Sequence, residues 1–192
     1  MFFIVKEPSD NSSWNYYLLY NLSLVKYRIV GVFYIPELRY YGPVLDLDDN
    51  DLEKVCKDIF IPIDEECLLR SLAIICERCG WCCEEDAGSF LFEHELAEVK
   101  QFIGRKLTLP SKEVKLWNGT RVRIYLLDLE QEGRCIFYDV RTRSCRIHLV
   151  KPVICMVTYC ARFAIDRWGR RYLREGTRQP DGSVRFRPAH VR

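Results

Sequence analysis

Four cysteines stand within eight residues near the middle of the chain: Cys76, Cys79, Cys82 and Cys83. Gaps of two residues let successive thiolates converge on one centre, and a triplet with a remote fourth thiolate is typical of ferredoxin-type iron-sulfur ligation. Burial of cysteine as a small apolar side chain does not require such spacing. The pattern therefore predicts a metal-binding loop, in which Cys83 serves either a second metal or as a reactive thiol beside the first.

Further cysteines follow the loop and could supply the remote thiolate; they are Cys135, Cys145, Cys155 and Cys160. An iron-sulfur cluster of the 4Fe-4S type is the favoured cofactor, because zinc sites normally use pairs of cysteines rather than triplets. The zinc alternative takes Cys76 and Cys79 as one pair and draws two more ligands from Cys135, Cys145 and Cys155. His148 could also ligate either metal, although packing is its simpler role.

Three segments of the chain resemble the YkgJ-type cysteine-cluster family, whose members are described as zinc- or iron-chelating domains. The matching segments are residues 76–83, which read CERCGWCC, residues 135–139, and residues 145–155, which end in KPVIC. The resemblance implies metal chelation over about Cys76 to Cys160. The chain departs from the family pattern at His148, where Tyr is usual, and at Lys151 and Met156, where Arg is usual. None of these departures affects a thiolate.

The chain has ten cysteines, and a reducing compartment opposes a disulfide framework. Metal binding is therefore the first interpretation. Disulfides remain the alternative if the source is a hyperthermophile, a possibility suggested by many Arg and Glu and few Gln and Met residues. Cys56 and Cys67 lie outside the motif on apolar faces, so we expect core packing there, with a mutual disulfide as the alternative.

No segment predicts a membrane span or a secretion signal. The longest apolar stretches, Leu72 to Cys76 and Val153 to Cys160, are far shorter than the ~20 residues that a spanning helix needs. Met1 to Val5 is followed at once by charged residues and a proline, without a signal-peptide pattern. We therefore expect a cytoplasmic location and no membrane partner. No Ser-His-Asp set, P-loop or paired carboxylates indicate a defined reaction.

The C-terminal segment after Cys160 is strongly basic. It contains nine arginines against three acidic residues, a net charge of +6 where the whole chain has +2. Aromatic side chains, among them Trp168 and Tyr172, are interleaved with the arginines, as in proteins that bind nucleic acid. The segment Arg162–Arg192 is therefore either a nucleic-acid surface on a zinc-stabilised module or a solvated hairpin. His94 and His190 are expected to be ordinary surface residues.

Strands and helices occur in separate runs, which predicts an α+β fold. Residues 27–35 read as a strand that ends at Pro36, and two helices should follow. Asp48, Asp49 or Asn50 can cap the first, which is expected to run to Phe60, and Asp64 can cap the second. The second helix is expected to continue through Ile75 into the cysteine loop. A short helix is expected over 93–104, ending at Gly104, with its glutamates Glu93, Glu95 and Glu98 in solvent.

The segment 112–127 predicts a hairpin. A three-residue loop of Trp117, Asn118 and Gly119, with Gly119 left-handed, places Val114 and Val122 on the buried face, whereas a two-residue loop does not. The whole sequence thus predicts a small cysteine-cluster metal-binding domain with an N-terminal strand and helix region and a basic C-terminal hairpin. We expect the boundaries at 1–71, 72–160 and 161–192.

Overall fold

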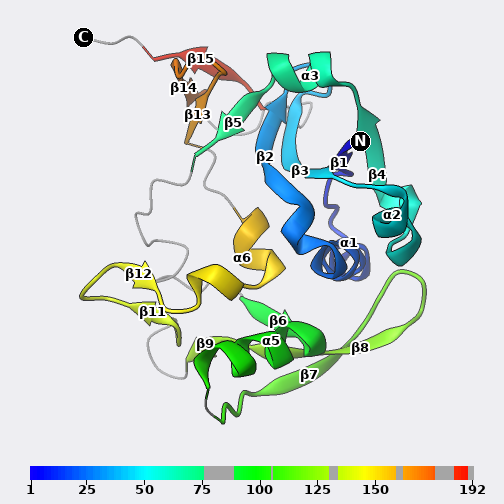
Figure 1. Ribbon diagram of the computed structural model, residues 1–192, viewed down its shortest axis with the longest axis vertical. Coiled ribbons are helices and arrows are strands. Elements are labelled where there is room, and N and C mark those ends of the chain that lie inside the picture. Colours follow the sequence, from blue (N-terminus) through cyan, green and yellow to red (C-terminus); the bar gives the residue numbers. More distant parts are fainter. Residues whose placement is uncertain (76–88, 105, 130–133, 159–161, 176–183, 190–192) are drawn as a thin grey trace. The chain divides into compact units, whose positions relative to one another are not determined.

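The protein is described by a computed structural model, shown as a ribbon in Figure 1. The structure describes residues 1–75, 89–104, 106–129, 134–158, 162–175 and 184–189. The chain divides into two compact units. Unit 1 comprises Met1–Glu7, Val25–Cys76 and Tyr159–Arg192, and unit 2 comprises Pro8–Leu24 and Glu77–Thr158.

Unit 1 is built on an eight-stranded sheet with the order β15-β14-β13-β5-β2-β3-β1-β4, in which all pairs are antiparallel. In chain order the strands are β1 Phe2–Val5, β2 Ile29–Ile35, β3 Tyr40–Asp46, β4 Phe60–Ile63, β5 Leu72–Ile74, β13 Phe163–Ile165, β14 Arg171–Arg174 and β15 Phe186–Pro188. The strand expected before Pro36 is β2, which follows a 3₁₀ turn at Lys26–Arg28. The two ends of the chain therefore fold into one sheet.

Two clusters of buried side chains hold this sheet. Ile4, Ile35 and Val44 form one cluster, and Cys67 and Leu68 pack against it. The other joins strands that are far apart in the sequence, because Val32 and Ile74 meet Ala164 and Val184 there. The second cluster attaches β13 and its neighbours to the N-terminal strands.

Asp48, one of three candidates for the first cap, and Asp64 are the observed helix caps. Asp48 accepts a hydrogen bond from the Asp51 amide at 2.9 Å and caps α2 (Asp49–Lys54). Asp64 accepts one from the Cys67 amide at 2.6 Å and caps α3 (Glu65–Arg70). The first helix is shorter than expected, since a 3₁₀ turn at Lys57–Ile59 follows it and leads into β4.

The expectation that the second helix runs into the cysteine loop is wrong. The helix α3 ends at Arg70, and β5 leads to Ile75 instead. Ser71 is extended, and its hydroxyl donates to the Leu68 carbonyl at 2.6 Å, which satisfies one of the last helical carbonyls. β5 then pairs with both β2 and β13, so sheet formation overrides the helical pattern of the sequence.

Over its described residues, unit 2 combines three α-helices with short antiparallel strands. The helices are α1 Ser12–Leu24, α5 Glu93–Ile103 and α6 Val153–Val157, and a 3₁₀ turn lies at His148–Val150. The strands are β6 Phe90–Phe92, β7 Ser111–Lys115, β8 Arg121–Leu126, β9 Asp128–Leu129, β10 Arg134–Cys135, β11 Tyr138–Asp139 and β12 Ser144–Cys145. The sequence pattern does not predict α1. The helix expected over 93–104 is confirmed as α5, and Gly104 ends it with φ 64°.

The three-residue hairpin loop is also confirmed. β7 and β8 pair Val114 with Val122, and the Leu116 amide donates to the Thr120 carbonyl at 2.8 Å. Gly119 has φ 87°, the left-handed conformation that was expected for a three-residue loop. The loop length thus follows from the need to keep Leu116 and Ile124 buried.

The observed architecture is α+β, with five α-helices and several antiparallel sheets among the described residues. The expected C-terminal hairpin is present as β13 and β14. Within the described part of the chain, no helix is long and apolar enough to cross a membrane.

Candidate metal centre

Five of the predicted ligands, Cys76, Cys79, Cys82, Cys83 and Cys160, lie outside the described residues, as does His190. The other three predicted ligands, Cys135, Cys145 and Cys155, all belong to unit 2 and are half-buried. The described part of the candidate site therefore consists of these three cysteines and their surroundings.

Cys135 and Cys145 are held by two short hairpins. Cys135 ends β10 and pairs with Asp128, whereas Cys145 ends β12 and pairs with Tyr138. Both side chains pack against one buried cluster that includes Leu127, Phe137 and Ile147. Half-burial against an apolar cluster keeps a sulfur in place while leaving one side of it accessible.

Cys155 lies on the short helix α6, and its position is fixed through a buried carboxylate. The Glu95 side chain is fully buried and accepts hydrogen bonds from the Val153 amide at 2.7 Å and the Phe92 amide at 3.1 Å. These bonds tie the first turn of α6 to the start of α5. Our expectation that Glu95 is solvated is wrong, because the orphan amides of two helix starts need an acceptor in the core.

The Cys155 thiol also lies next to the residue at which the described chain resumes after the cysteine loop. Its Sγ is 3.9 Å from the hydroxyl of Ser89, which is buried. Ser89 stands six residues after Cys83 in the sequence. Sequence analysis missed both Glu95 and Ser89, since no local spacing relates either residue to Cys155.

The residues that flank Cys76 and Cys160 are hydrogen-bonded neighbours in unit 1. The Ile75 amide, next to Cys76 in the chain, donates to the Phe163 carbonyl at 3.2 Å. Ladder pairing continues from there, with Ile74 opposite Ala164 and Ala73 opposite Ile165. Phe163 stands three residues beyond Cys160, so the sheet brings the flanks of these two cysteines together.

Cys67 is half-buried and packs against the core, in agreement with the packing role expected for it. It packs against the Ile4 cluster, and no disulfide joins it to Cys56. Burial, together with the nearby Glu37 carboxylate at 3.8 Å from its Sγ, raises the pKa of this thiol and keeps it protonated at neutral pH. A protonated thiol is a poor metal ligand, which agrees with the absence of Cys67 from the predicted set. Cys56 precedes the 3₁₀ turn at Lys57–Ile59 rather than lying on the helix face expected for it.

The two described histidines, His94 and His148, have different surroundings. His148 is exposed at the start of its 3₁₀ turn. The His94 ring stacks on Phe92 at 6.0 Å between centroids, and its Nε2 lies 2.9 Å from the Ser23 hydroxyl. His94 is thus part of an aromatic contact rather than a metal site.

The described residues by themselves contain no group of three or more His, Cys, Asp or Glu side chains that could hold a metal ion. Thiolates are nevertheless the donor type that zinc and iron-sulfur clusters prefer. The predicted ligands Cys76, Cys79, Cys82, Cys83 and Cys160 lie outside the described residues and therefore stay a prediction.

Comparison with known proteins identifies the family. Residues 75–172, just over half of the chain, match the sequence model of the CxxCxxCC family, described as "putative zinc- or iron-chelating domain". An uncharacterised protein of Methanocaldococcus jannaschii is 30% identical over 130 aligned positions, which cover 60% of this chain and 64% of the relative. The match thus spans less than two thirds of that relative's length. No solved structure matches the chain. The chain belongs to the CxxCxxCC family of zinc- or iron-chelating domains.

Proposed function

We propose that the protein holds an iron-sulfur cluster of the 4Fe-4S type and serves a redox or accessory role. The thiolates of Cys76, Cys79 and Cys82 supply three ligands, and Cys135, Cys145, Cys155 or Cys160 supplies the fourth. Such a cluster, when bound, accepts and donates single electrons. Residues 72–160 form the proposed metal-binding domain, with 1–71 and 161–192 as its flanking regions.

The positions of Cys155 and of the residues that flank Cys76 and Cys160 support this proposal. In unit 2, Cys155 lies against Ser89, where the described chain resumes after the cysteine loop. In unit 1, Ile75 and Phe163 form a hydrogen bond that brings together the flanks of Cys76 and Cys160. Thiolates that are distant in sequence gain from such placing, because a shared cation offsets their mutual repulsion.

Zinc is the alternative metal. It would be bound tetrahedrally, by Cys76 and Cys79 with two of the distal thiolates, and it would stabilise the fold without redox chemistry. A cytoplasmic location is part of the same proposal, since a reducing compartment keeps the thiols available.

Metal analysis of protein purified without oxygen separates the two metals. A brown protein that absorbs in the blue part of the visible spectrum and contains iron with acid-labile sulfide would support the cluster. A colourless protein with stoichiometric zinc would exclude it and leave the zinc site. A metal-free protein with its cysteines paired as disulfides would exclude both.

We propose as a second property that the segment Arg162–Arg192 contacts nucleic acid. The observation in its favour is that aromatic and cationic side chains share the β13–β14 hairpin, where the Arg171 guanidinium lies 4.8 Å from the centroid of the Phe163 ring. Salt-dependent retention on heparin and RNA columns tests this property, and Arg171→Gln, which leaves the sheet of unit 1 complete, should elute at lower salt than the wild type.

A further inference from the structure

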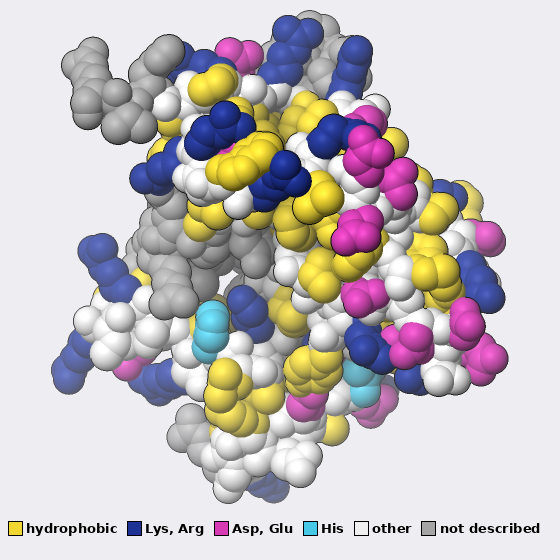
Figure 2. Space-filling model, turned by 45° about the horizontal axis from the view of Figure 1, so that its top comes forward, with side chains coloured by type: hydrophobic (Ala, Val, Ile, Leu, Met, Phe, Trp, Pro, Cys, Tyr) yellow, Lys and Arg dark blue, Asp and Glu magenta, His cyan; other side chains and the backbone are white. Residues whose placement is uncertain are grey.

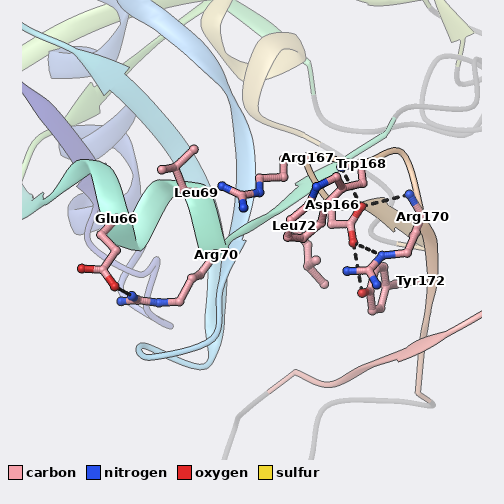
Figure 3. Close-up of a pocket in the computed structure, with 9 residues that line it drawn as sticks. All are labelled: Glu66, Leu69, Arg70, Leu72, Asp166, Arg167, Trp168, Arg170 and Tyr172. Carbon is pink, nitrogen blue, oxygen red and sulfur yellow. Dashed lines mark hydrogen bonds and ion pairs between the residues drawn. The ribbon is translucent and has the colours of Figure 1, made fainter.

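A pocket of about 380 Å³ lies in unit 1 beside the turn between β13 and β14 (Figure 3). Leu69 and Arg70 of α3 and Leu72 of β5 line one part of it, and Trp168 and Tyr172 of the hairpin line another. Its walls therefore combine apolar and cationic side chains with two carboxylates, Glu66 and Asp166, which pair with Arg70 and Arg170. The volume falls within the range of small-ligand sites and accommodates one planar ring system.

The Asp166 carboxylate holds the turn in one conformation. This side chain is buried and accepts hydrogen bonds from the amides of Trp168 at 2.9 Å and Arg170 at 3.0 Å. Arg170 Nε donates to it at 2.6 Å and the Tyr172 hydroxyl at 3.3 Å, as the dashed lines of Figure 3 show. Because the turn is already ordered, it loses little conformational entropy when a ligand binds.

Trp168 is 65% exposed at this turn. The guanidinium carbons of Arg167 and Arg170 lie 4.1 Å and 4.8 Å from the centroid of its ring. Asp166 binds Arg170, whereas Arg167 forms no ion pair with any residue that the structure describes. Arg167 can therefore leave the ring for a phosphate group while Arg170 stays in place.

The surroundings favour a phosphate-rich partner. All nine lysines of the chain precede residue 152, and the segment from 161 to 192 contains nine arginines and no lysine. Arginine binds phosphate in a bidentate manner and stacks on planar rings, which lysine does not do. Figure 2, which brings this end of the molecule forward, shows Lys and Arg side chains gathered around hydrophobic ones.

We propose that this pocket binds one unpaired base of a single-stranded nucleic acid. The base stacks on Trp168, and Arg167 contacts the adjacent phosphate. A duplex cannot use the site, because its bases are already paired and stacked on one another. This inference rests on the nucleic-acid property proposed above, and it is independent of the metal.

The test measures fluorescence anisotropy of labelled oligouridine and oligothymidine of about 12 nucleotides with the full, metal-loaded chain. A blunt duplex of the same length is the third probe. Trp168→Ala should weaken single-strand binding about tenfold and Trp168→Phe much less, because the smaller ring still stacks. Arg167→Gln should lower the slope of log affinity against log salt by about 0.7, the value for one phosphate contact on a single strand.

Trp117→Ala is the matched control, since Trp117 is another exposed tryptophan (60%) on a hairpin loop of the other unit. It should leave binding unchanged. If the wild type binds but Trp168→Ala binds equally well, or the duplex binds as tightly as single strands, the pocket assignment is overturned while the nucleic-acid property stands. If the wild type binds none of the probes, both are overturned. Metal content of the same samples reports on the metal proposal separately.

Discussion

At the residue scale, the cysteines outside and inside the family motif differ in their surroundings. Cys67 lies near the Glu37 carboxylate, and burial together with this charge raises the pKa of its thiol. Cys155 lies 3.9 Å from the Ser89 hydroxyl, on a helix tied to the core by Glu95. A metal ligand must lose its proton, so the surroundings of Cys67 oppose ligation.

We therefore expect Cys155→Ser to reduce the metal content of the purified protein to about half or less, because a serine hydroxyl is a poor replacement for a thiolate. Cys67→Ser is the matched control and should keep the metal content of the wild type. Elemental analysis of both variants, purified without oxygen, measures the effect. Equal metal loss in the two variants would contradict a specific role of Cys155 in metal binding.

Asp166 gives a pH prediction at the same scale. Burial by itself raises the pKa of its carboxyl, but the hydrogen bonds from Arg170 and from the Trp168 amide outweigh this effect and hold the pKa below its ordinary value. A carboxyl with a depressed pKa stabilises the fold at all pH values above its unfolded pKa of about 3.9, and this stabilisation is lost as the pH falls through the folded pKa.

Carboxyl-carbon NMR should therefore find the Asp166 midpoint below about 3.9. Asp166→Asn should lower the urea midpoint of unfolding at neutral pH, and its difference from the wild type should shrink in acid as the wild-type carboxyl becomes protonated. A difference that stays constant from neutral pH into acid would show that the charge of Asp166 has no part in holding the turn.

At the element scale, features set by neighbouring residues could be predicted from the sequence, and features set by distant residues could not. The Asp48 and Asp64 caps, the Gly104 helix end and the 117–119 loop each depend on a few adjacent positions, and all are observed. The end of α3 at Arg70 depends instead on β5 pairing with strands remote in sequence. Likewise, the spacing of the cysteines identifies the loop, whereas Glu95 and Ser89 are brought to Cys155 only by the fold.

The contact between α5 and α6 makes a prediction for Glu95. Glu95→Ala leaves the buried amides of Phe92 and Val153 without this acceptor, and should lower the free energy of unfolding by about 3 kcal/mol. It should also weaken metal binding, because α6 then holds Cys155 less firmly. Glu95→Gln keeps one carbonyl acceptor and should have a smaller effect on both.

Urea unfolding of the loaded protein and metal competition with a chelator measure these two effects. Glu98→Ala, on the same helix but only half-buried, is the control. A loss of stability in Glu95→Ala without any change in metal affinity would restrict Glu95 to a structural role.

At the scale of the whole molecule, the two units differ in their relation to the proposed metal. The buried cluster of unit 2, which includes Leu96, Val99 and Phe137, has Cys135 and Cys145 packed against it. In the described part of unit 1, the thiol that packs against a buried cluster is that of Cys67, which lies outside the predicted ligand set. The free energy of metal binding by thiolates also stabilises the folded structure that holds these thiolates.

Removal of the metal should therefore affect the two units unequally. We expect a chelator, added under reducing conditions, to speed amide hydrogen exchange in α5 and β8 while β2 and β3 keep most of their protection. The physical reason is that thiolates left without a cation repel one another or take up protons, and the side chains packed against them lose their support. Hydrogen exchange followed by mass spectrometry, with and without chelator, resolves these segments.

Re-addition of the metal should restore the protection, which distinguishes loss of the metal from irreversible damage. Equal loss of protection in β2 and β3 would show that the metal stabilises the whole chain as one cooperative body, and no change in α5 would place the ligands away from the Cys135 and Cys145 hairpins.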